Sequence, residues 1–313
     1  MSAEHSREQE NGIFVIAGKE ALKPKEIPML GIFGKTAPET WEKAVQAVWE
    51  HGTSIPAQTD GPADPQNRDA SLVMVIADPL DEPRIHRNFI GGIDELWVYR
   101  QEVVQGVHDH WVREGGWSYS YHGRLTDWPE RFGRERLSQI VGHEMDFSVN
   151  QLESLVAQLA AAPHTRRAQA ITWVPFIDAT HHDPPCLQRI WCRIVDSDGD
   201  LILQMNTHWR SRDILKAAFM NIFALTELQK SLADSISRVL GRPVTVGRYV
   251  DIVDSAHIYG SYERRGEIQL FLKRIATSDF ACRVWRSDDP LVQEQFAIGQ
   301  KRLDEELAAR QLK

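Results

Sequence analysis

Several chemically active side chains lie close together in residues 184–221. Cys186 follows two prolines, the motif Arg-Ser-Arg-Asp occupies residues 210–213, and Asn221 comes eight residues later. A cysteine thiolate is a strong nucleophile, a guanidinium binds phosphate, and a carboxamide can recognise the edge of a base. This combination predicts a nucleotide-binding site built around Cys186 as the nucleophile.

Three arginines elsewhere are candidate phosphate ligands. Arg68 precedes an apolar, strand-like run at residues 70–77, and a solvated surface arginine is the alternative interpretation. Arg166 and Arg167 come directly before a second such run at residues 170–176. Adjacent residues entering a strand point to opposite faces. The pair therefore favours a role across a subunit boundary over one shared patch, and two surface arginines are again the alternative.

Two further positions have functional and structural interpretations. His257 and Tyr259 are two residues apart, so on a strand they would share one face, an arrangement that suits a sugar hydroxyl. Glu95 lies beside Leu96 in an apolar helical pattern. A buried, unpaired carboxylate is unfavourable, so Glu95 either lies at the helix edge or has a chemical task.

Hydrophobic periodicity predicts the elements that position these side chains. The first ten residues are expected to be disordered, and Thr36 and Glu39 have the spacing of a capping box at the start of a helix. The other predicted elements are helices over 88–105, 149–161, 221–240 and 290–313, strands over 12–18, 27–33, 70–77, 170–176 and 244–253, and a strand pair after Cys186. Trp117, Tyr119 and Tyr121 alternate as in a strand and could stack on a planar ligand.

Composition excludes several classes of function. The chain has 313 residues, a net charge of −8 and a pI near 5.9, which argues against broad nucleic-acid binding. Its three cysteines make no disulfide framework, and it has no apolar run of membrane-spanning length. The acidic, polar N-terminus lacks the hydrophobic region of a signal peptide. We therefore expect a cytoplasmic protein that binds neither nucleic acid nor membrane.

Three histidine-containing segments are candidate metal sites. His143-Glu144 resembles the start of a zincin helix, but Phe147 stands where the second histidine is required. The segments 108–110 and 181–183 have no partners at ligand spacing. We predict no metal.

Over about residues 37–275, the motifs of this chain resemble those of the thymidylate synthase family. That family includes the pyrimidine-nucleotide hydroxymethylases. The motifs are Asp94-Glu-Leu-Trp97, Pro163-His-Thr-Arg166-Arg167, Pro184-Pro185-Cys186, the 210–213 motif with Asn221, and Asp254-Ser-Ala-His257-Ile-Tyr259. The resemblance implies an α+β thymidylate-synthase fold, a large twisted mixed sheet flanked by helices, in a homodimer that packs sheet against sheet. We expect residues 1–35 to be an N-terminal extension that could form a hairpin, 36–285 the catalytic domain and 286–313 a charged C-terminal helix.

The same resemblance implies a role for each candidate residue. Cys186 adds to C6 of the pyrimidine, and C5 then takes a one-carbon unit from 5,10-methylenetetrahydrofolate. The phosphate is bound by Arg68, Arg210 and Ser211, with Arg166 and Arg167 supplied by the partner subunit. Asn221 recognises the N3 and O4 edge of the pyrimidine, and His257 and Tyr259 bind the ribose 3′-hydroxyl. Asp213 contacts the folate, and Glu95 organises the water that takes part in proton transfer. Tyr121 matches the family's active-site tyrosine, and Trp111 matches its folate-stacking tryptophan.

Departures from the family pattern bear on the reaction. Leu187 replaces the histidine that usually follows the cysteine, position 212 is arginine, and Lys216-Ala217-Ala218 replaces a turn that contains glycine and proline. Residues 290–313 are charged, whereas synthases close the site with a short apolar tail that shields the C5-methylene intermediate. A site that is not sealed would let water attack that methylene, which gives hydroxymethylation.

We therefore expect a dUMP hydroxymethylase, because asparagine at position 221 goes with uracil in the family. The alternatives are a thymidylate synthase that converts dUMP to dTMP, a dCMP or CMP hydroxymethylase, and a non-catalytic nucleotide-binding homologue. Hydroxymethylases of this family occur in bacteriophages that modify their DNA and in nucleoside-antibiotic pathways. A phage protein would act in the host cytoplasm.

Overall fold

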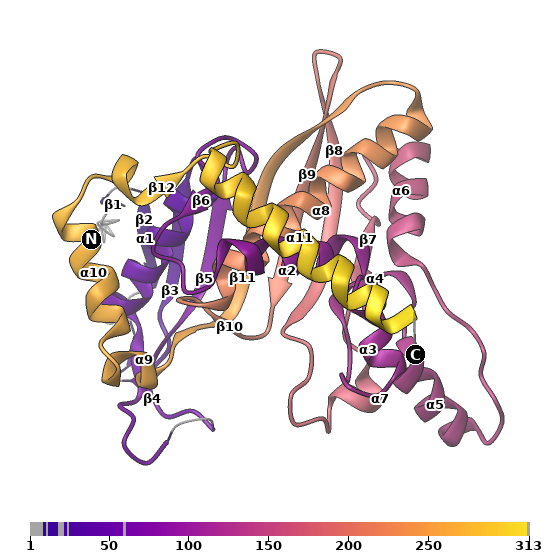
Figure 1. Cartoon of the computed structure of the whole chain (residues 1–313), viewed down its shortest axis with the longest axis horizontal. Helices are drawn as coiled ribbons and strands as arrows, with labels where there is room; N and C mark the ends of the chain where they lie inside the picture. Colours follow the sequence, from indigo (N-terminus) through magenta and orange to yellow (C-terminus); the bar gives the residue numbers. More distant parts are fainter. Residues whose placement is uncertain (1–8, 11, 18–21, 24, 59–60, 312–313) are drawn as a thin grey trace, which may run out of the picture. The chain divides into compact units, whose positions relative to one another are not determined.

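The computed structural model describes residues 9–10, 12–17, 22–23, 25–58 and 61–311 (Figure 1). The chain divides into two compact units. Unit 1 contains the chain up to Gly91 with residues 209–221 and 249–292, and unit 2 contains residues 92–208, 222–248 and 293 onward. The disorder expected for residues 1–8 lies outside the described residues. Gln9–Glu10 form a short strand, β1, so the expectation is wrong for these two.

Unit 1 is built on a sheet with the strand order β1-β2-β3-β5-β11, in which β4 pairs with β5 and β10 with β11. β3 runs parallel to β5, and β11 runs antiparallel to it. The elements of unit 1 are β1, β2 (Ile13–Ala17), β3 (Met29–Gly34), α1 (Ala37–His51), β4 (Thr53–Ile55), β5 (Asn67–Ile76), β6 (Ile85–His86), β10 (Arg212–Asp213), α9 (Gly260–Arg264), α10 (Glu267–Thr277), η1 (Phe280–Arg283) and β12 (Val284–Trp285).

Trp41 of α1 lies at the centre of the unit 1 core. It is fully buried, and its ring packs against Phe219 and Phe271 with centroids 5.2 Å away in each case. Its indole Nε1 donates a hydrogen bond of 2.7 Å to the Ile214 carbonyl oxygen. Because Ile214 follows Asp213, this bond holds the end of the 210–213 motif against α1.

The start of α1 differs from the predicted capping box. Thr36 is the N-cap residue, but its side chain makes no capping hydrogen bond. The Glu39 carboxylate accepts from the Lys35 amide over 2.8 Å, so it satisfies a donor one residue before the N-cap. The helix begins where it was predicted because Pro38 suits its first turn and the apolar face packs on the sheet.

Unit 2 contains the strand order β11-β9-β8-β7 and most of the remaining helices. Its own elements are α2 (Ile93–Gln105), α3 (Asp109–Arg113), α4 (Tyr121–Thr126), α5 (Glu130–Val141), α6 (Gln151–Ala161), β7 (Gln169–Ile171), α7 (Pro175–Asp178) and β8 (Leu187–Ser197). Four elements run from one unit into the other: β9 (Asp200–Trp209), α8 (Ala217–Leu240), β11 (Val244–Ile258) and α11 (Pro290–Gln311).

The strand pair predicted after Cys186 is confirmed as β8 and β9. The turn between them contains Asp198 and Gly199, with φ angles of 54° and 97°. Positive φ at both central residues matches the twist of a tight β-hairpin, and glycine adopts it without strain. The Asp198-Gly199 turn therefore sets the pairing register of β8 and β9, the two strands that follow Cys186.

Two strand predictions in unit 2 are wrong. Residues 117–120 form a loop and Tyr121 begins α4, because the Ser120 hydroxyl accepts from the Gly123 amide over 2.8 Å and caps the helix. In the predicted strand 170–176, β7 ends at Ile171 and α7 begins at Pro175. Proline has a backbone angle that suits the first helical turn and lacks the donor that a strand needs.

The C-terminal helix α11 packs along α2 within unit 2 (Figure 1). The Phe296 ring lies 4.9 Å from the Trp97 ring, and the Trp97 indole donates to Gln300 over 2.9 Å. Gly299 allows the close approach, since a Cβ at that position would lie 2.5 Å from the Asp94 carbonyl oxygen. The predicted helix thus exists as a docked element.

His108 connects α11 to the aromatic region around α3. Its Nδ1 lies 3.1 Å from Glu102, and its Nε2 lies 3.6 Å from Glu306 of α11. Burial lowers the pKa of His108, but the hydrogen bond to Glu102 and the charges of Glu102 and Glu306 outweigh burial and raise it above 6.5 overall. His110 also lies near Glu306, with its Nε2 4.0 Å from the carboxylate.

We expect the contribution of His108 to stability to decline as the pH rises. Because its pKa is raised on folding, that contribution is complete below the unfolded value near 6.5 and is lost as the pH passes the higher folded pKa. The measurement is the difference in Tm between wild type and His108→Gln across this pH range. The difference should shrink toward alkaline pH, and a constant or growing difference would contradict the assignment.

Candidate functional site

Cys186 lies at the end of a loop, directly before β8, and is partly exposed. Hydrogen bonds hold its two neighbours, Pro185 and Leu187. Gln188 Nε2 donates to the Pro185 carbonyl oxygen over 2.8 Å, and the Leu187 amide donates to the Tyr121 hydroxyl over 3.4 Å. The Leu187 side chain is fully buried. The residue that carries the thiol is therefore positioned by β8 and by the first residue of α4.

A cavity of about 350 Å³ lies beside this loop in unit 2. Its lining combines aromatic rings with polar groups and includes Trp117, Tyr119, Tyr121, Glu102, His181 and Asp183. Burial raises the pKa of Tyr119, and the nearby Tyr121, Cys186 and Asp183 raise it further, so its hydroxyl remains protonated. Aromatic walls next to a cysteine suit a flat heterocyclic ligand.

Two tryptophans occupy different surroundings near this cavity. Trp111 stacks face to face on His108, with ring centroids 3.9 Å apart and an interplanar angle of 5°. Trp117 packs edge-on against Trp111 at 4.5 Å and lines the cavity with Tyr121. The folate-stacking role of Trp111 remains a prediction. Trp117 is a second candidate for that role, which sequence reasoning recognised only as part of an aromatic run.

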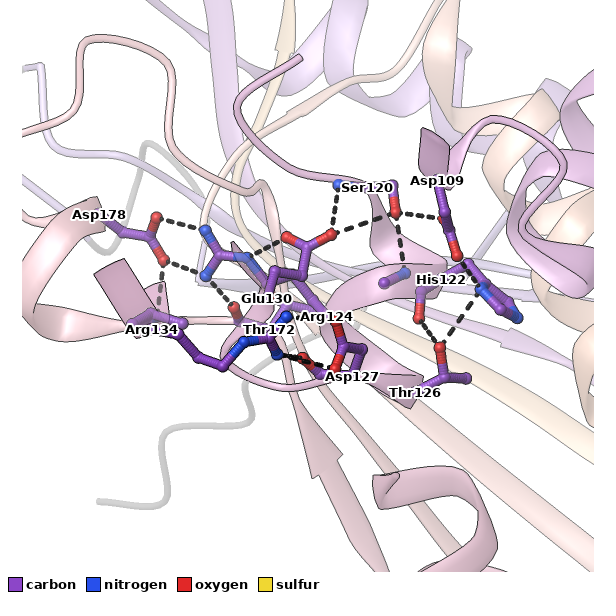
Figure 2. A network of polar contacts seen from close by, with 12 residues as sticks. Asp109, Ser120, His122, Arg124, Thr126, Asp127, Glu130, Arg134, Thr172 and Asp178 are labelled. Carbon is purple, nitrogen blue, oxygen red and sulfur yellow. Dashed lines mark hydrogen bonds and ion pairs between the residues drawn. The ribbon is translucent and has the colours of Figure 1, made fainter. Parts of the chain in front are cut away.

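A buried ionic network supports the helix that begins with Tyr121 (Figure 2). Arg124 is 1% exposed and donates to both carboxylate oxygens of Asp178 over 2.9 and 3.0 Å. It also donates to Glu130 over 2.7 Å and to the Thr172 carbonyl oxygen over 2.9 Å. Burial raises the pKa of Glu130 to about 7, although Arg124 acts in the opposite direction. The network ties α4 to α5, α7 and the end of β7.

Three other candidate residues of unit 2 are exposed. Glu95 lies in the first turn of α2, where its carboxylate accepts from the Gly92 amide over 3.5 Å. This is the helix-edge position that the sequence allowed. Arg166 and Arg167 lie in the loop between α6 and β7. All three side chains are accessible to a ligand, and their roles remain predictions.

In unit 1 the side chains of the 210–213 motif have different environments. Arg212 is 2% exposed, pairs with Asp251 and lies over the Trp209 ring, 4.1 Å from its centroid. It also donates to the Ala218 carbonyl oxygen over 3.1 Å. Arg212 therefore braces the start of α8, whereas Arg210 and Ser211 are half-buried. This explains the arginine at position 212 as a structural residue.

Asp213 is held through both carboxylate oxygens. Oδ1 accepts from the Leu215 and Lys216 amides over 3.1 and 3.0 Å, and Oδ2 accepts from the Tyr262 hydroxyl over 2.6 Å. Burial raises the pKa of Asp213, and these hydrogen bonds oppose that rise. Tyr262 is a residue that sequence reasoning missed. The sequence feature that could have identified Tyr262 is its spacing of three residues from Tyr259, about one helical turn.

The Lys216-Ala217-Ala218 segment begins α8 earlier than predicted. The helix starts at Ala217, not at Asn221. Alanine has the highest helix propensity, and the Asp213 carboxylate satisfies the two backbone donors that precede the first turn. Asn221 consequently lies one turn inside the helix and is 8% exposed.

His257 lies between two aspartates in the sheet of unit 1. In the strand register, His257 lies opposite Asp213 of β10 on one side and opposite Asp69 of β5 on the other. Its Nδ1 lies 3.3 Å from the Ser255 carbonyl oxygen, and its buried Nε2 has no hydrogen-bond partner among the described residues. A buried ring nitrogen left unpaired is unfavourable unless a ligand or water completes it.

The expectation that His257 and Tyr259 share one strand face is wrong. β11 ends at Ile258, and Tyr259 is the N-cap residue of α9. The two rings nevertheless meet in a T-shaped arrangement with centroids 4.6 Å apart. Arg68 lies opposite Ile258 on β5, with its guanidinium 5.3 Å from the centre of the Trp49 ring.

The candidate residues thus form two groups, each described within its own unit. Unit 1 holds the predicted folate contact Asp213 together with the predicted phosphate, base and ribose ligands: Arg68, Arg210, Ser211, Asn221, His257 and Tyr259. Unit 2 holds Cys186 and the predicted proton-transfer, folate and partner-phosphate residues: Glu95, Trp111, Tyr121, Arg166 and Arg167. In the described part of the chain, no cluster of three His, Cys, Asp or Glu side chains could hold a metal, and no helix is long and apolar enough to cross a membrane.

Comparisons with known proteins connect these groups to one family. A family model described as thymidylate synthase matches residues 94–295. A relative from Methanococcoides burtonii, named "Putative thymidylate synthase", is 26% identical over 230 residues, 73% of this chain and 88% of its own. One of the same name from Methanopyrus kandleri is 28% identical over 232 residues, 74% of this chain and 93% of its own.

The fold has a counterpart among solved structures. Thermostable thymidylate synthase A from Bacillus subtilis superimposes with a TM-score of 0.51 at 19% identity, over 76% of this chain and 84% of that one. At this identity the match shows the fold alone. It confirms the predicted α+β fold with a mixed sheet flanked by helices, while the sheet-to-sheet homodimer and the boundaries at residues 35 and 285 remain predictions.

Proposed function

This chain belongs to the thymidylate synthase family, and we propose that it transfers a one-carbon unit from 5,10-methylenetetrahydrofolate to C5 of a pyrimidine nucleoside monophosphate. The observation that carries the proposal is the partly exposed Cys186, which ends a loop whose residues His181 and Asp183 line a cavity with aromatic walls. Trp117 and Tyr121 in that lining fit the flat ring of a reduced folate. The folate supplies a one-carbon unit at the oxidation level of formaldehyde.

Cys186 is the nucleophile of the proposed reaction. Its thiolate forms a bond to C6 of the pyrimidine, and the C5–C6 double-bond electrons move toward O4, so that C5 becomes nucleophilic. C5 bonds to the methylene carbon and then loses its proton, for which Glu95 and an ordered water are the proposed acceptors. The electron pair left at C5 breaks the carbon–nitrogen bond to the folate, so that tetrahydrofolate leaves and water adds to the exocyclic methylene. When the thiolate leaves C6, the C5–C6 double bond forms again and the free thiol is recovered.

Most of the proposed nucleotide ligands are charged or hydrogen-bonding side chains of unit 1. Arg68, Arg210 and Ser211 bind the phosphate, with Arg166 and Arg167 of a second copy of the chain, because a dianion needs several charged donors. Asn221 pairs with the uracil edge. The unpaired Nε2 of His257 supports a hydrogen bond to the ribose 3′-hydroxyl, which Tyr259 shares. Asp213, held by Tyr262, contacts the folate.

We propose that dUMP is hydroxymethylated, with water as the third reactant. dUMP, methylenetetrahydrofolate and water then give 5-hydroxymethyl-dUMP and tetrahydrofolate. Two observations support this outcome. Position 187, next to the nucleophile, carries a fully buried leucine that cannot order a polar group. Phe296 and Gln300 of α11 contact Trp97 of α2, so this helix is packed within unit 2 and is not available as a closing segment over an intermediate.

Methylation of dUMP to dTMP is the second candidate, favoured by the names of the archaeal relatives. In that reaction the folate also supplies a hydride and leaves as dihydrofolate. Incubation with dUMP and methylenetetrahydrofolate, followed by mass analysis of the nucleotide, separates the two. We expect a gain of CH₂O with tetrahydrofolate as co-product. A gain of CH₂ with dihydrofolate would establish the synthase, and no product with dUMP, dCMP or CMP would refute the enzyme.

A further inference from the structure

Two backbone hydrogen bonds join the loop that carries Arg166 and Arg167 to β8. The Ile194 amide donates to the Pro163 carbonyl oxygen over 3.1 Å, and the Cys192 amide donates to the Ala168 carbonyl oxygen over 3.0 Å. These contacts fix the two ends of the loop. The arginines between them are exposed, so their direction depends on what holds the middle.

Trp191 supplies that central contact. Its indole Nε1 donates to the Arg166 carbonyl oxygen over 3.1 Å. On β8 it lies between Cys192 and Ile190, whose side chains are buried, so Trp191 belongs to the opposite face of the strand. Its partner in the register is Gln169, at the start of β7. The indole thus reaches back from the strand to the backbone of the arginine itself.

We propose that Trp191 is a positioning residue for phosphate binding, acting through Arg166. This rests on the proposed function, in which the exposed guanidiniums of this loop bind the nucleotide phosphate of a second copy of the chain. A long, exposed arginine loses much side-chain entropy when it binds, so a fixed backbone lowers the entropic penalty. β8 begins at Leu187, directly after Cys186. In this proposal the same strand therefore positions the nucleophile of its own chain and the arginines that bind the phosphate in the second copy of the chain.

Trp191→Phe tests this proposal because it removes the indole donor and keeps an aromatic ring on the strand. We expect the Kd of dUMP to rise about 3- to 10-fold, the range for one lost hydrogen bond. The Kd of deoxyuridine, which lacks the phosphate, should not change. In turnover the KM for dUMP should rise while kcat stays near the wild-type value.

Trp285→Phe is the matched control, since it removes an indole donor on β12, where the ring packs 4.6 Å from Arg87. Binding is measured by calorimetry, and light scattering verifies that each variant keeps the oligomeric state of the wild type.

Thr165→Val is the second variant, because the Thr165 hydroxyl accepts from the Arg167 amide over 3.3 Å. It should also weaken dUMP binding selectively.

The outcomes distinguish this inference from the function on which it rests. If wild type binds dUMP no more tightly than deoxyuridine, the proposed nucleotide site fails and the inference fails with it. If wild type shows the phosphate-dependent difference but Trp191→Phe binds both ligands as wild type does, or weakens both equally, only the positioning role is overturned.

Discussion

Replacement of Cys186 by alanine is expected to lower turnover of dUMP by at least about a thousandfold, because the covalent route to C5 is lost. Binding of dUMP should persist, since the proposed phosphate, base and ribose ligands lie on other residues. The measurement is the initial rate of product formation with dUMP and methylenetetrahydrofolate, together with the Kd of dUMP for the same preparation.

The other cysteines provide controls for this substitution. Cys192 is fully buried, and burial raises the pKa of its thiol to about 12, so it does not supply a thiolate near neutral pH. Cys282 is exposed and lies in η1. Cys282→Ala should therefore retain the wild-type rate. Continued turnover in Cys186→Ala would refute covalent catalysis at this residue.

Replacement of Arg124 by methionine is expected to lower the free energy of unfolding by about 3–5 kcal/mol. The substitution leaves the carboxylates of Glu130 and Asp178, which are 4% and 3% exposed, without their buried counter-charge. It also removes the donor to the Thr172 carbonyl oxygen. Denaturant unfolding, followed by circular dichroism, measures the loss.

An exposed ion pair on α5 gives the matched control for Arg124. Arg131 lies 2.6 Å from Glu135, and their side chains are 46% and 48% exposed. Arg131→Met should change the free energy of unfolding by less than about 1 kcal/mol, since water screens exposed pairs. Equal effects of the two substitutions would show that the network around Arg124 does not carry the stability assigned to it.

Much of the fold was predictable because local patterns determine it. Alternating apolar residues around Asp198-Gly199 specify the hairpin of β8 and β9, and helical periodicity specifies α6 and α8. The loop before α4 was not predictable from its alternating aromatics. Its conformation depends on the Ser120 cap and on Arg124, whose partner Asp178 is 54 positions away in the sequence.

The candidate site was predictable as a set of residue types and less so as a set of contacts. The family motifs identified Cys186 and Asp213, but not Tyr262, whose bond to Asp213 spans 49 positions. The indole of Trp191 likewise reaches Arg166 only because β7 and β8 pair. Such partners arise from tertiary packing, and no local periodicity encodes them.

Water labelled with ¹⁸O gives the most direct test of hydroxymethylation at the Cys186 site. The enzyme is incubated with dUMP and methylenetetrahydrofolate in the labelled water, and the mass of the nucleotide product is measured. We predict a hydroxymethylated nucleotide that carries ¹⁸O in its new hydroxyl group, formed only when Cys186 is present. A methylated product without the label, or labelled product from Cys186→Ala, would contradict it.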